Sequence, residues 1–358
     1  MKAPDFFYSR DSSFLLSLAL SPLTVASWFY WAGASLHSYL YKKRILNPRR
    51  LGCKVISVGS PMVGGTGKTP LAAQVADILR SAGYRVALAS RGYGGKSKAG
   101  VTLVSDGQRI LENASHVGDE PLVLAAHAPG VPVLIARDRG LAGLRAISDF
   151  DTEVLILDDG FNHHRLVRDL EVVTLDGGMG LGNGYCLPRG PLRTPVSHLS
   201  RADVEVLVDD PMLADVEKER PQRNAQPPQF SAIRRAEGLD SLSGEGSVTC
   251  SWLNGKRVGI FSGIAYPDSF ERMLSSLGAR VVVRKDFSDH YRYQSKDFSD
   301  PSMTGILWIT TEKDAVKIDQ DWVSHLNIFV LKMELELEVG FSDWLVETVA
   351  RPIDPSQS

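Results

Sequence analysis

The stretch GGTGKTP, residues 64–70, lies between a short apolar run, Val55 to Val58, and a run with helical periodicity that begins near Leu71. A strand that leads into a glycine-rich turn and then into a helix is the arrangement of a phosphate-binding loop. Glycines let backbone N–H groups turn inward, the lysine reaches the terminal phosphates, and the threonine hydroxyl can bind a magnesium ion. The stretch therefore predicts a nucleotide-binding α/β fold.

The predicted loop departs from the strict pattern GxxxxGK[ST] at its first position, where this chain has Met62 and its nearest upstream glycine is Gly59. A glycine-rich turn in another kind of α/β protein is the alternative. The GKT triplet with its flanking strand and helix favours the nucleotide loop, with ATP and Mg²⁺ as the expected ligands. The expected nucleotide-binding residues are Met62, Val63, Gly64, Gly65, Thr66, Gly67, Lys68 and Thr69.

Size, charge and cysteine content limit the possible functions. With 358 residues, a length of roughly 150 per domain predicts about two domains. A net charge of −2 gives no electrostatic footprint for duplex nucleic acid, so no nucleic-acid partner is expected. The three cysteines are far apart in sequence and form no CxxC pair. This argues against a disulfide framework or a structural zinc site and favours a reducing, cytoplasmic setting.

The amino terminus is strongly apolar. No Asp, Glu, Lys or Arg occurs from Ser12 through Tyr41, a run of 30 residues that is long enough to cross a bilayer. Aromatic residues at 28–31 suit a membrane interface, and the basic residues that follow at 42–44 favour the cytoplasmic side for the rest of the chain. We predict a membrane-anchor helix within residues 1–43. A signal peptide cleaved near residues 32–34 and a buried core helix are the alternatives.

Periodicity after the anchor predicts a doubly covered parallel sheet. A strand at 55–58, a helix at 71–82 and a strand at 85–89 form a βαβ unit. Continuous apolar runs are typical of parallel strands buried on both faces. We therefore predict further strands at 131–136, 154–157, 172–175 and 204–208.

Two aspartates follow the apolar run 154–157 and mark a metal site. A strand that ends in aspartate beside a phosphate loop is the Walker B arrangement, in which a carboxylate holds magnesium. We therefore expect Thr69, Asp158 and Asp159 as metal ligands, and a simple Asp-Gly turn is the alternative. Asp119 precedes an apolar helix predicted at 122–128, so it is either a helix cap or a functional residue.

A long loop at 177–199 is rich in glycine and proline and contains Arg189 and Arg193. Long loops in compact domains are usually functional, which makes Arg193 a candidate phosphate-binding residue. His163 and His164 lie on an earlier turn. Without further Cys or His at ligand spacing, we interpret them as hydrogen-bonding residues.

The composition changes at about residue 210, and four domain-level segments result. Residues 1–43 are the anchor, 44–210 the P-loop nucleotide-binding domain, 211–256 an irregular, proline-containing linker, and 257–358 a smaller α/β domain. In the last segment we predict strands at 258–261, 280–283, 306–310 and 328–331, with helices at 269–277 and 341–349. The predicted fold is a P-loop NTPase-like, mostly parallel sheet with helices on both faces, followed by the smaller α/β domain.

Eight motifs between residues 55 and 318 occur in the order typical of one enzyme family. They are GGTGKTP, SRGYGG, GDEP, DDGFNHHRL, GNGYCLPRGPLR, FSGIAYP, FSDHYRY and TTEKDAVK. With the hydrophobic amino terminus, the chain resembles the tetraacyldisaccharide 4'-kinases, the lipid A 4'-kinases of Gram-negative bacteria. The resemblance implies transfer of the γ-phosphate of ATP to the 4'-hydroxyl of a tetraacyl glucosamine disaccharide 1-phosphate, at the cytoplasmic face of the inner membrane. No obligate protein partner is implied.

The resemblance also implies roles for single residues. Asp119 of GDEP is expected to be the general base and His290 of FSDHYRY its orienting partner, while Lys68 and Arg193 lie at the phosphates. An aspartate held by a histidine is a suitable acceptor for a sugar proton. The chain departs from the family pattern in having Ser60 for Asn, Asn162 for Gln and Thr194 for Glu.

Two other functional classes are weaker interpretations of the same loop. A membrane-associated switch ATPase that acts on protein partners usually has a lysine just before the paired glycines, where this chain has Val63. A GTPase usually needs an [NT]KxD sequence, and residues 310–314, TTEKD, have their lysine one position too late. Stimulation of ATP turnover by a lipid disaccharide is expected of a kinase and not of a switch.

Overall fold

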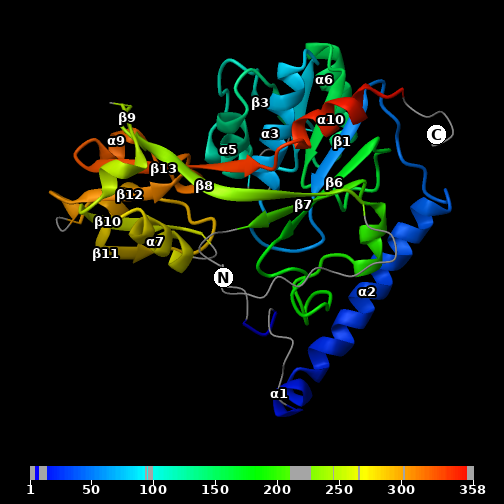
Figure 1. Cartoon of the computed structure of the whole chain (residues 1–358), viewed down its shortest axis with the longest axis horizontal. Coiled ribbons are helices and arrows are strands. Elements are labelled where there is room, and N and C mark those ends of the chain that lie inside the picture. The colour runs from blue at the N-terminus through cyan, green and yellow to red at the C-terminus, as the bar shows by residue number, and fades with distance from the viewer. Residues whose placement is uncertain are drawn as a thin grey trace.

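The computed structural model describes residues 5–7, 14–92, 95, 100–209, 227–244, 246–264, 267–300 and 303–352. One sheet runs through the whole molecule, with the strand order β11-β10-β12-β13-β8-β7-β6-β1-β5-β2-β4-β3 and with β9 paired to β8 (Figure 1). The strands are β1 Lys54–Gly59, β2 Val86–Ser90, β3 Thr102–Ser105, β4 Val133–Ile135, β5 Val154–Asp158, β6 Leu170–Asp176, β7 Val204–Asp209, β8 Gln229–Ser241, β9 Ser247–Val248, β10 Arg257–Ser262, β11 Arg280–Asp286, β12 Leu307–Thr311 and β13 Asn327–Leu337.

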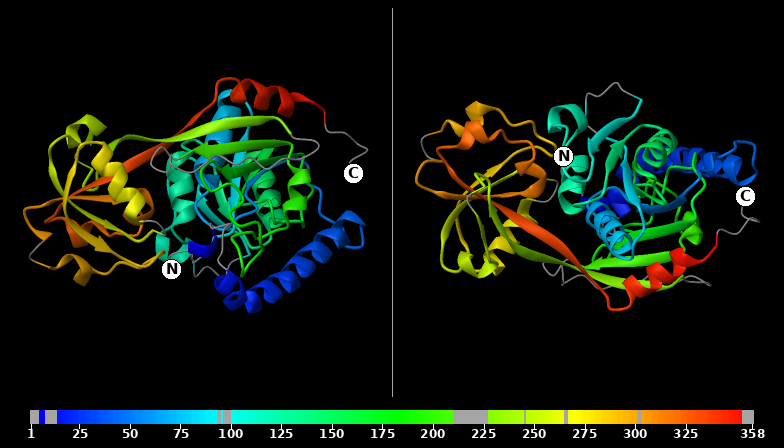
Figure 2. Two further views of the ribbon diagram at one scale, coloured as in Figure 1. Left: turned by 60° about the horizontal axis from the view of Figure 1, so that its bottom comes forward. Right: turned by 90° about the horizontal axis from the view of Figure 1, so that it is seen from above.

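Helices cover both faces of the sheet, which confirms the predicted fold class. Helices α3, α5 and α10 share one hydrophobic core with the inner strands, and α6 packs in a second core on the opposite face (Figure 2). The α-helices are α1 Phe14–Ala19, α2 Ser21–Lys42, α3 Lys68–Ser81, α4 Ala114–Val117, α5 Glu120–His127, α6 Arg139–Phe150, α7 Pro267–Ser276, α8 Glu312–Ala315, α9 Gln320–Val323 and α10 Phe341–Ala350, and short 3-10 helices lie at Asp5–Phe7, Val196–Arg201, Cys250–Leu253 and Ser295–Phe298.

The strands around β1 are parallel, as their apolar runs predict. β1 pairs in parallel with β5 and β6, and β2 pairs in parallel with β5 and β4. Their carboxyl ends therefore meet at one edge, where Gly59 and Asp158 lie next to the phosphate loop. The predicted helix at 71–82 starts earlier, at Lys68, because Gly67 adopts a left-handed φ of 78° that joins the loop directly to α3.

The prediction of an irregular connection over 211–256 is wrong in its second half. Residues 229–241 form β8, which pairs in parallel with β7 and antiparallel with β13. Period-2 patterning is weak here because most residues of this strand are partly exposed, so that neither face is fully buried. We call β8 and β13 the connecting ribbon, because they join the nucleotide-binding lobe around β1 to the C-terminal lobe around β10 (Figure 1). Residues 210–226 lie outside the described residues.

The carboxyl-terminal helix does not belong to the C-terminal lobe as the predicted boundaries had it. Phe341, Leu345 and Val349 of α10 pack in the same core as α3, and Lys54 of β1 donates hydrogen bonds to the carbonyl oxygens of Val349 and Arg351. The chain therefore returns to the nucleotide-binding lobe after completing the C-terminal one. A domain boundary predicted at residue 257 misses this return. The lobe to which α10 belongs is determined by packing partners that are far away in sequence.

The amino-terminal helices lie along the outside of the nucleotide-binding lobe (Figure 1). Among the described residues, no helix has the length and apolar character needed to span a membrane. The buried-core alternative is wrong, since Trp28, Phe29 and Trp31 of α2 are 63%, 77% and 51% exposed. Parts of the predicted anchor, residues 1–4 and 8–13, lie outside the described residues.

Candidate active site

The phosphate loop is held from several sides. Met62 is buried and packs with Leu192 in a small core, so it replaces the usual first glycine as a packing residue. The Val63 N–H donates to the Pro191 carbonyl at 2.9 Å, and the Thr66 hydroxyl lies 3.1 Å from that of Thr174 on β6. These contacts fix the base of the loop against β6 and the 177–199 loop. They hold the loop in place although its first position is Met62 and not glycine.

Lys68 and the loop apex stand at the start of α3. Lys68 Nζ donates to the Gly64 carbonyl at 3.1 Å, and burial lowers the pKa of Lys68 in spite of the nearby charges of Asp159 and Asp158. Gly64 has a φ of 106°, and no described atom lies within 4 Å of the place where a Cβ would stand at Gly64 or Gly65. The apex of the loop therefore borders open space at both glycines, and Lys68 lies beside it.

Asp158 faces Thr69 at the start of α3. The Thr69 hydroxyl donates to both Asp158 oxygens at 3.3 and 3.4 Å. Burial, with the charge of Glu120 added to it, raises the pKa of Asp158 to about 7. A hydroxyl and a buried carboxylate that lacks full compensation are oxygen donors of the kind that Mg²⁺ accepts, so this pair fits the predicted metal site.

The described residues hold no cluster of three or more His, Cys, Asp or Glu side chains suited to a metal.

Asp159 is engaged elsewhere. Arg193 forms a two-pronged ion pair with it, with N–O distances of 2.6 and 2.7 Å, and also donates to the Ser60 carbonyl at 2.9 Å. Burial alone would raise the pKa of Asp159, but the Arg193 hydrogen bonds and the charge of Lys68 lower it to about 2. In this state Asp159 holds the arginine and Asp158 faces the threonine, so the two aspartates have different surroundings.

Asp119 and His290 meet although 171 residues separate them. His290 Nδ1 lies 3.0 Å from both carboxylate oxygens of Asp119. Asp119 also caps α5 by accepting from the Glu120 N–H at 3.0 Å, so the capping role and the contact with histidine coexist. Burial would raise the pKa of Asp119, but the His290 hydrogen bond and the charges of Lys313 and Lys317 lower it, and the Asp119 hydrogen bond raises the pKa of His290.

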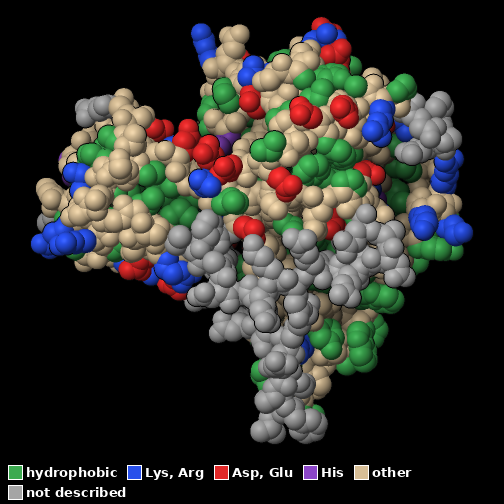
Figure 3. All heavy atoms as spheres, in the orientation of Figure 1, with side chains coloured by type: hydrophobic (Ala, Val, Ile, Leu, Met, Phe, Trp, Pro, Cys, Tyr) green, Lys and Arg blue, Asp and Glu red, His purple; other side chains and the backbone are tan. Residues whose placement is uncertain are grey.

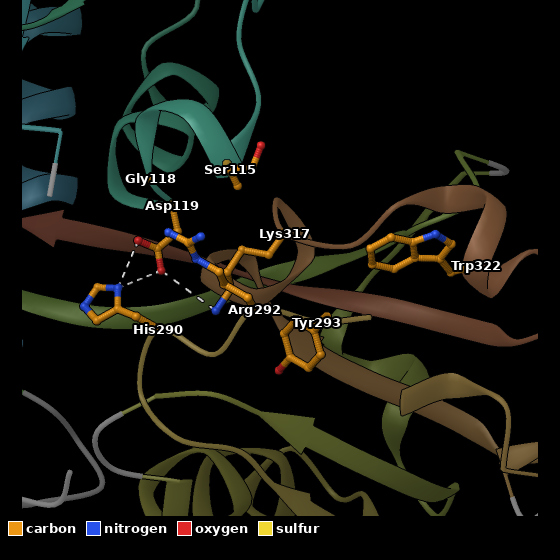
Figure 4. Close-up of a pocket in the computed structure, with 9 residues that line it drawn as sticks. Ser115, Gly118, Asp119, His290, Arg292, Tyr293, Lys317 and Trp322 are labelled. Carbon is orange, nitrogen blue, oxygen red and sulfur yellow. Dashed lines mark hydrogen bonds and ion pairs between the residues drawn. The ribbon is translucent and has the colours of Figure 1, made fainter. Parts of the chain in front are cut away.

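Lysines from α8 and the residues after it surround this pair. Lys313 Nζ lies 3.3 Å from His290 Nε2 and 3.1 Å from Asp289, and Lys317 Nζ lies 3.8 Å from Asp119. Figure 4 shows the Asp119 and His290 side chains pointing toward each other. Both line a cavity of about 350 Å³. The cavity is lined by Ala114, Ser115, Gly118, Asp119, His290, Arg292, Tyr293, Lys317 and Trp322.

His290 and Asp159 share an unusual backbone conformation. Their φ angles are 58° and 55°, in the left-handed region that residues other than glycine seldom adopt. Strained residues of this kind persist where the surrounding structure holds them, and they cluster at functional sites. Both belong to the set predicted from the sequence.

The adjacent histidines have structural partners. His163 Nδ1 lies 3.3 Å from Arg139, and His164 Nδ1 lies 3.0 Å from Arg201. Burial and these arginines lower the histidine pKa values to about 4 and about 3, which keeps both rings neutral at physiological pH. This agrees with their interpretation as hydrogen-bonding residues.

Comparison with known proteins gives this site a family. Residues 19–350 match the family model described as Tetraacyldisaccharide-1-P 4'-kinase, LpxK. The chain belongs to this family. A tetraacyldisaccharide 4'-kinase of Syntrophus aciditrophicus (strain SB) is 41% identical over 312 residues, with 83% of each chain covered. Another, of Anaeromyxobacter sp. (strain Fw109-5), is 36% identical over 333 residues, covering 90% of this chain and 89% of its own length.

A solved structure supports the same assignment for this tetraacyldisaccharide 4'-kinase family member. It is described as the "apo" form of LpxK from Aquifex aeolicus in complex with ATP. The two structures agree with a TM-score of 0.77 at 32% sequence identity, over 94% of this chain and all of the other. The family resemblance inferred from the eight motifs is thereby confirmed, and the chain is a kinase.

Several residues of the kinase site were not predicted from the sequence. Glu120 adds its charge to that of Asp158 and also acts on Lys68 and Arg193, although only its neighbour in the GDEP motif was singled out. Lys313 lies in TTEKDAVK, a motif quoted without a role for its lysines. Both are charged residues within recognised motifs, so the sequence did mark them. Which groups their charges act on depends on the tertiary structure.

Proposed function

We propose that this kinase transfers the γ-phosphate of ATP to the 4'-hydroxyl of a tetraacyl glucosamine disaccharide 1-phosphate, a step of lipid A biosynthesis, at a membrane surface. The observation that carries the proposal is the 3.0 Å contact of Asp119 with His290, which joins the two lobes in the active-site region. Family membership supports the lipid disaccharide as acceptor, and the solved relative in complex with ATP supports the donor.

Asp119 acts in this proposal as the general base. The 4'-oxygen forms its bond to the γ-phosphorus while the bond from that phosphorus to the β–γ bridging oxygen breaks, so ADP leaves with that oxygen. The hydroxyl proton passes to the Asp119 carboxylate. Its lowered pKa keeps it ionised at neutral pH. A weak base suffices because the transition state of phosphoryl transfer is loose and positioning contributes most of the catalysis.

Two basic side chains are expected to bind the transferred phosphate. Lys68 stands at the inner side of the loop, and Arg193 lies within 2.7 Å of Asp159. A bound phosphate chain competes for this guanidinium, because arginine pairs with phosphate oxygens in the same two-pronged way as with a carboxylate. In this proposal the Arg193 guanidinium turns from Asp159 toward the phosphate when the nucleotide is bound.

Thr69 and Asp158 hold the metal ion in this proposal. Their oxygens are adjacent, and the pKa of Asp158 near 7 means that a cation competes with a proton for the carboxylate. When bound, Mg²⁺ neutralises charge on the β- and γ-phosphate oxygens. Asp159 contributes through Arg193 rather than through a direct bond.

Helix α2 brings the active site to a lipid substrate. One side of the helix contacts the active-site loop, through hydrogen bonds from Ser27 to Cys186 and from Tyr30 to the Arg193 carbonyl. Its other side exposes aromatic residues, and Figure 3 shows hydrophobic side chains gathered along the helix. A helix with an apolar outer face and basic residues at its end is suited to lie in a membrane interface. We place the kinase at the cytoplasmic face of the inner membrane of a Gram-negative bacterium.

Steady-state kinetics of Asp119→Asn, His290→Ala and the double variant test the proposal, with ATP and the lipid disaccharide as substrates. Each single variant should lower kcat by roughly 10²–10⁴-fold, the range for general acid–base groups. Because the pair acts as one unit, the double variant should be scarcely worse than the poorer single one.

ATP affinity, measured without the lipid, is the control. It should change far less than kcat in all three variants, because neither side chain touches the phosphate loop. Two mild defects that multiply in the double variant, or a loss of ATP binding in Asp119→Asn, would return Asp119 to a capping role. Absence of phosphate transfer to the disaccharide by the wild-type protein would refute the function itself.

A further inference from the structure

The connecting ribbon leaves the nucleotide-binding lobe at a definite residue. β8 pairs with β7 from Gln229 opposite Glu205 to Ile233 opposite Asp209. Arg234 is the next residue, at the point where β8 leaves β7 and continues toward the C-terminal lobe paired with β13. Any relative movement of the two lobes has to pass through this part of the ribbon.

Arg234 reaches the apex of the phosphate loop. Its Nη2 donates a hydrogen bond to the carbonyl oxygen of Gly65. Gly65 is exposed, and its surroundings among the described residues are otherwise open. Because the loop N–H groups turn inward to bind phosphate, a donor that holds a carbonyl from outside fixes the orientation of the peptide that does the binding.

The same rung of the ribbon is attached to the helix that follows the loop. Arg234 lies opposite Leu335 in the antiparallel register of β8 and β13. Gln74, in the second turn of α3, donates a hydrogen bond to the Leu335 carbonyl. One strand of the rung therefore contacts the loop, and the other contacts its helix.

The ribbon leads from this rung to His290 through contacts in the structure. Two residues along β13 from Leu335, the Met333 N–H donates to Glu312 at 3.2 Å. The residue after Glu312 is Lys313, whose Nζ lies 3.3 Å from His290 Nε2. The loop apex and the histidine are thus the two ends of one connected set of contacts.

We propose that Arg234 is a positioning residue that attaches the phosphate loop to the connecting ribbon, so that nucleotide in the loop fixes the C-terminal lobe with His290 against Asp119. The proposal rests on the proposed function, since that function gives the Asp119–His290 contact its role. Arg234 acts through the Gly65 peptide and the ribbon and has no part in the chemical step.

The neighbouring arginine offers a matched control. Arg235 is on the same strand and forms an ion pair with Glu336 on β13, with both side chains more than half exposed. Successive side chains of a strand point to opposite faces. The substitution Arg235→Ala therefore removes the same charge from the other side of the ribbon. Surface ion pairs of this kind contribute little to stability.

The experiment compares Arg234→Ala, Arg234→Lys and Arg235→Ala with the wild-type kinase in two measurements that need no lipid. The first is the Kd for Mg-ATP, and the second is hydrogen exchange of the segment around residues 286–293 with and without ATP. We expect Arg234→Ala to raise the Kd about tenfold and to abolish ATP-dependent protection of the segment, because one anchored hydrogen bond to a charged group is lost. Arg234→Lys should recover part of both effects, and Arg235→Ala should match wild type.

Three results would overturn the proposal. They are equal ATP affinity in the Arg234→Ala and Arg235→Ala variants, persistence of ATP-dependent protection in Arg234→Ala, and no ATP-dependent protection in the wild-type protein. If Arg234→Ala is too unstable to measure, Gln74→Leu tests the other attachment of the same rung and should weaken the protection too. Failure of the lipid kinase assay alone bears on the proposed function and leaves these measurements interpretable.

Discussion

Asp158 and Asp159 are adjacent in sequence, but their surroundings shift their pKa values in opposite directions. Burial, with Glu120 nearby, raises the pKa of Asp158 to about 7, while the ion pair with Arg193 lowers that of Asp159 to about 2 against the effect of burial. A carboxylate with a raised pKa in the folded state destabilises the protein at neutral pH, and one with a lowered pKa stabilises it. In the proposed function, a cation bound at Asp158 would compensate the charge of the first.

Asp158→Asn should therefore stabilise the ligand-free protein while it abolishes turnover. Asparagine can still accept from Thr69, and it avoids a buried charge. The free energy of unfolding should rise by on the order of 4 kcal/mol at pH 8, as a shift of about three pKa units implies. The gain should be absent below pH 4, grow as the pH rises through 4 to 7, and stay constant above, because wild-type Asp158 is neutral at low pH in both states.

Urea unfolding at several pH values measures this gain, and Asp159→Asn is the control of opposite sign. It removes the carboxylate that compensates Arg193, so it should destabilise the protein at neutral pH, with the difference from wild type shrinking as the pH falls toward 2. Equal destabilisation by both substitutions at pH 8 would mean that Asp158 is ionised and well compensated without a cation.

At the scale of the element, α2 combines contacts to the loop that contains Arg193 with exposed aromatic residues that we propose lie in the membrane interface. Ser27 and Tyr30 contact the loop that contains Arg193, whereas Trp28, Phe29 and Trp31 are exposed. Deleting residues 1–41 removes both sides at once. A single substitution on the exposed side separates membrane binding from the contacts with the active-site loop.

Phe29→Glu should reduce binding to vesicles without changing ATP affinity or the Tm. Phe29 is 77% exposed, so a charge there costs little in solution, whereas it opposes burial of the helix among lipid headgroups. Co-sedimentation with vesicles that contain anionic lipid, at moderate salt, measures the effect. Leu144→Glu on α6, at a residue that is 49% exposed, is the control and should bind like wild type. Unchanged binding of Phe29→Glu would exclude this face as the membrane contact.

At the scale of the whole molecule, the sheet and the last helix tie the lobes together. The sheet is continuous from β11 to β3, and α10 packs on the nucleotide-binding lobe after the chain has formed the C-terminal lobe. Phe341 of α10 is fully buried there, while Phe298 is buried in a separate core of the C-terminal lobe. Stability of the phosphate-loop region therefore depends on residues near the end of the chain.

Phe341→Ala should destabilise the nucleotide-binding lobe by about 3–5 kcal/mol, the usual cost of removing a buried phenylalanine. Hydrogen exchange should show lost protection in β1 and α3, some 270 residues away in sequence, before it appears in β10. Phe298→Ala is the matched substitution in the other core and should give the reverse order. Loss of protection confined to the C-terminal lobe in Phe341→Ala would place α10 with that lobe, as the sequence boundaries suggested.

The sequence by itself determined the parts of this protein that depend on local chemistry. Apolar runs are long enough to identify buried parallel strands, and the glycine-rich loop followed by Lys68 and Thr69 predicts phosphate binding because its geometry is encoded within eight residues. The eight ordered motifs were sufficient to recognise the family. Asp119 and His290 were paired through that resemblance and not from spacing.

Only the tertiary structure decided the relations between distant residues. Most residues of β8 are partly exposed on both faces, so its sequence has too weak a period to be recognised as a strand. It forms one because β7 and β13 supply its hydrogen-bonding partners on both sides. The different surroundings of Asp158 and Asp159 arise from Glu120 and Arg193, which come from other segments. The place of α10 and the contact of Arg234 with Gly65 depend likewise on chain segments more than a hundred residues apart. Burial, charge compensation and strand pairing act through space, and local sequence patterns do not contain them.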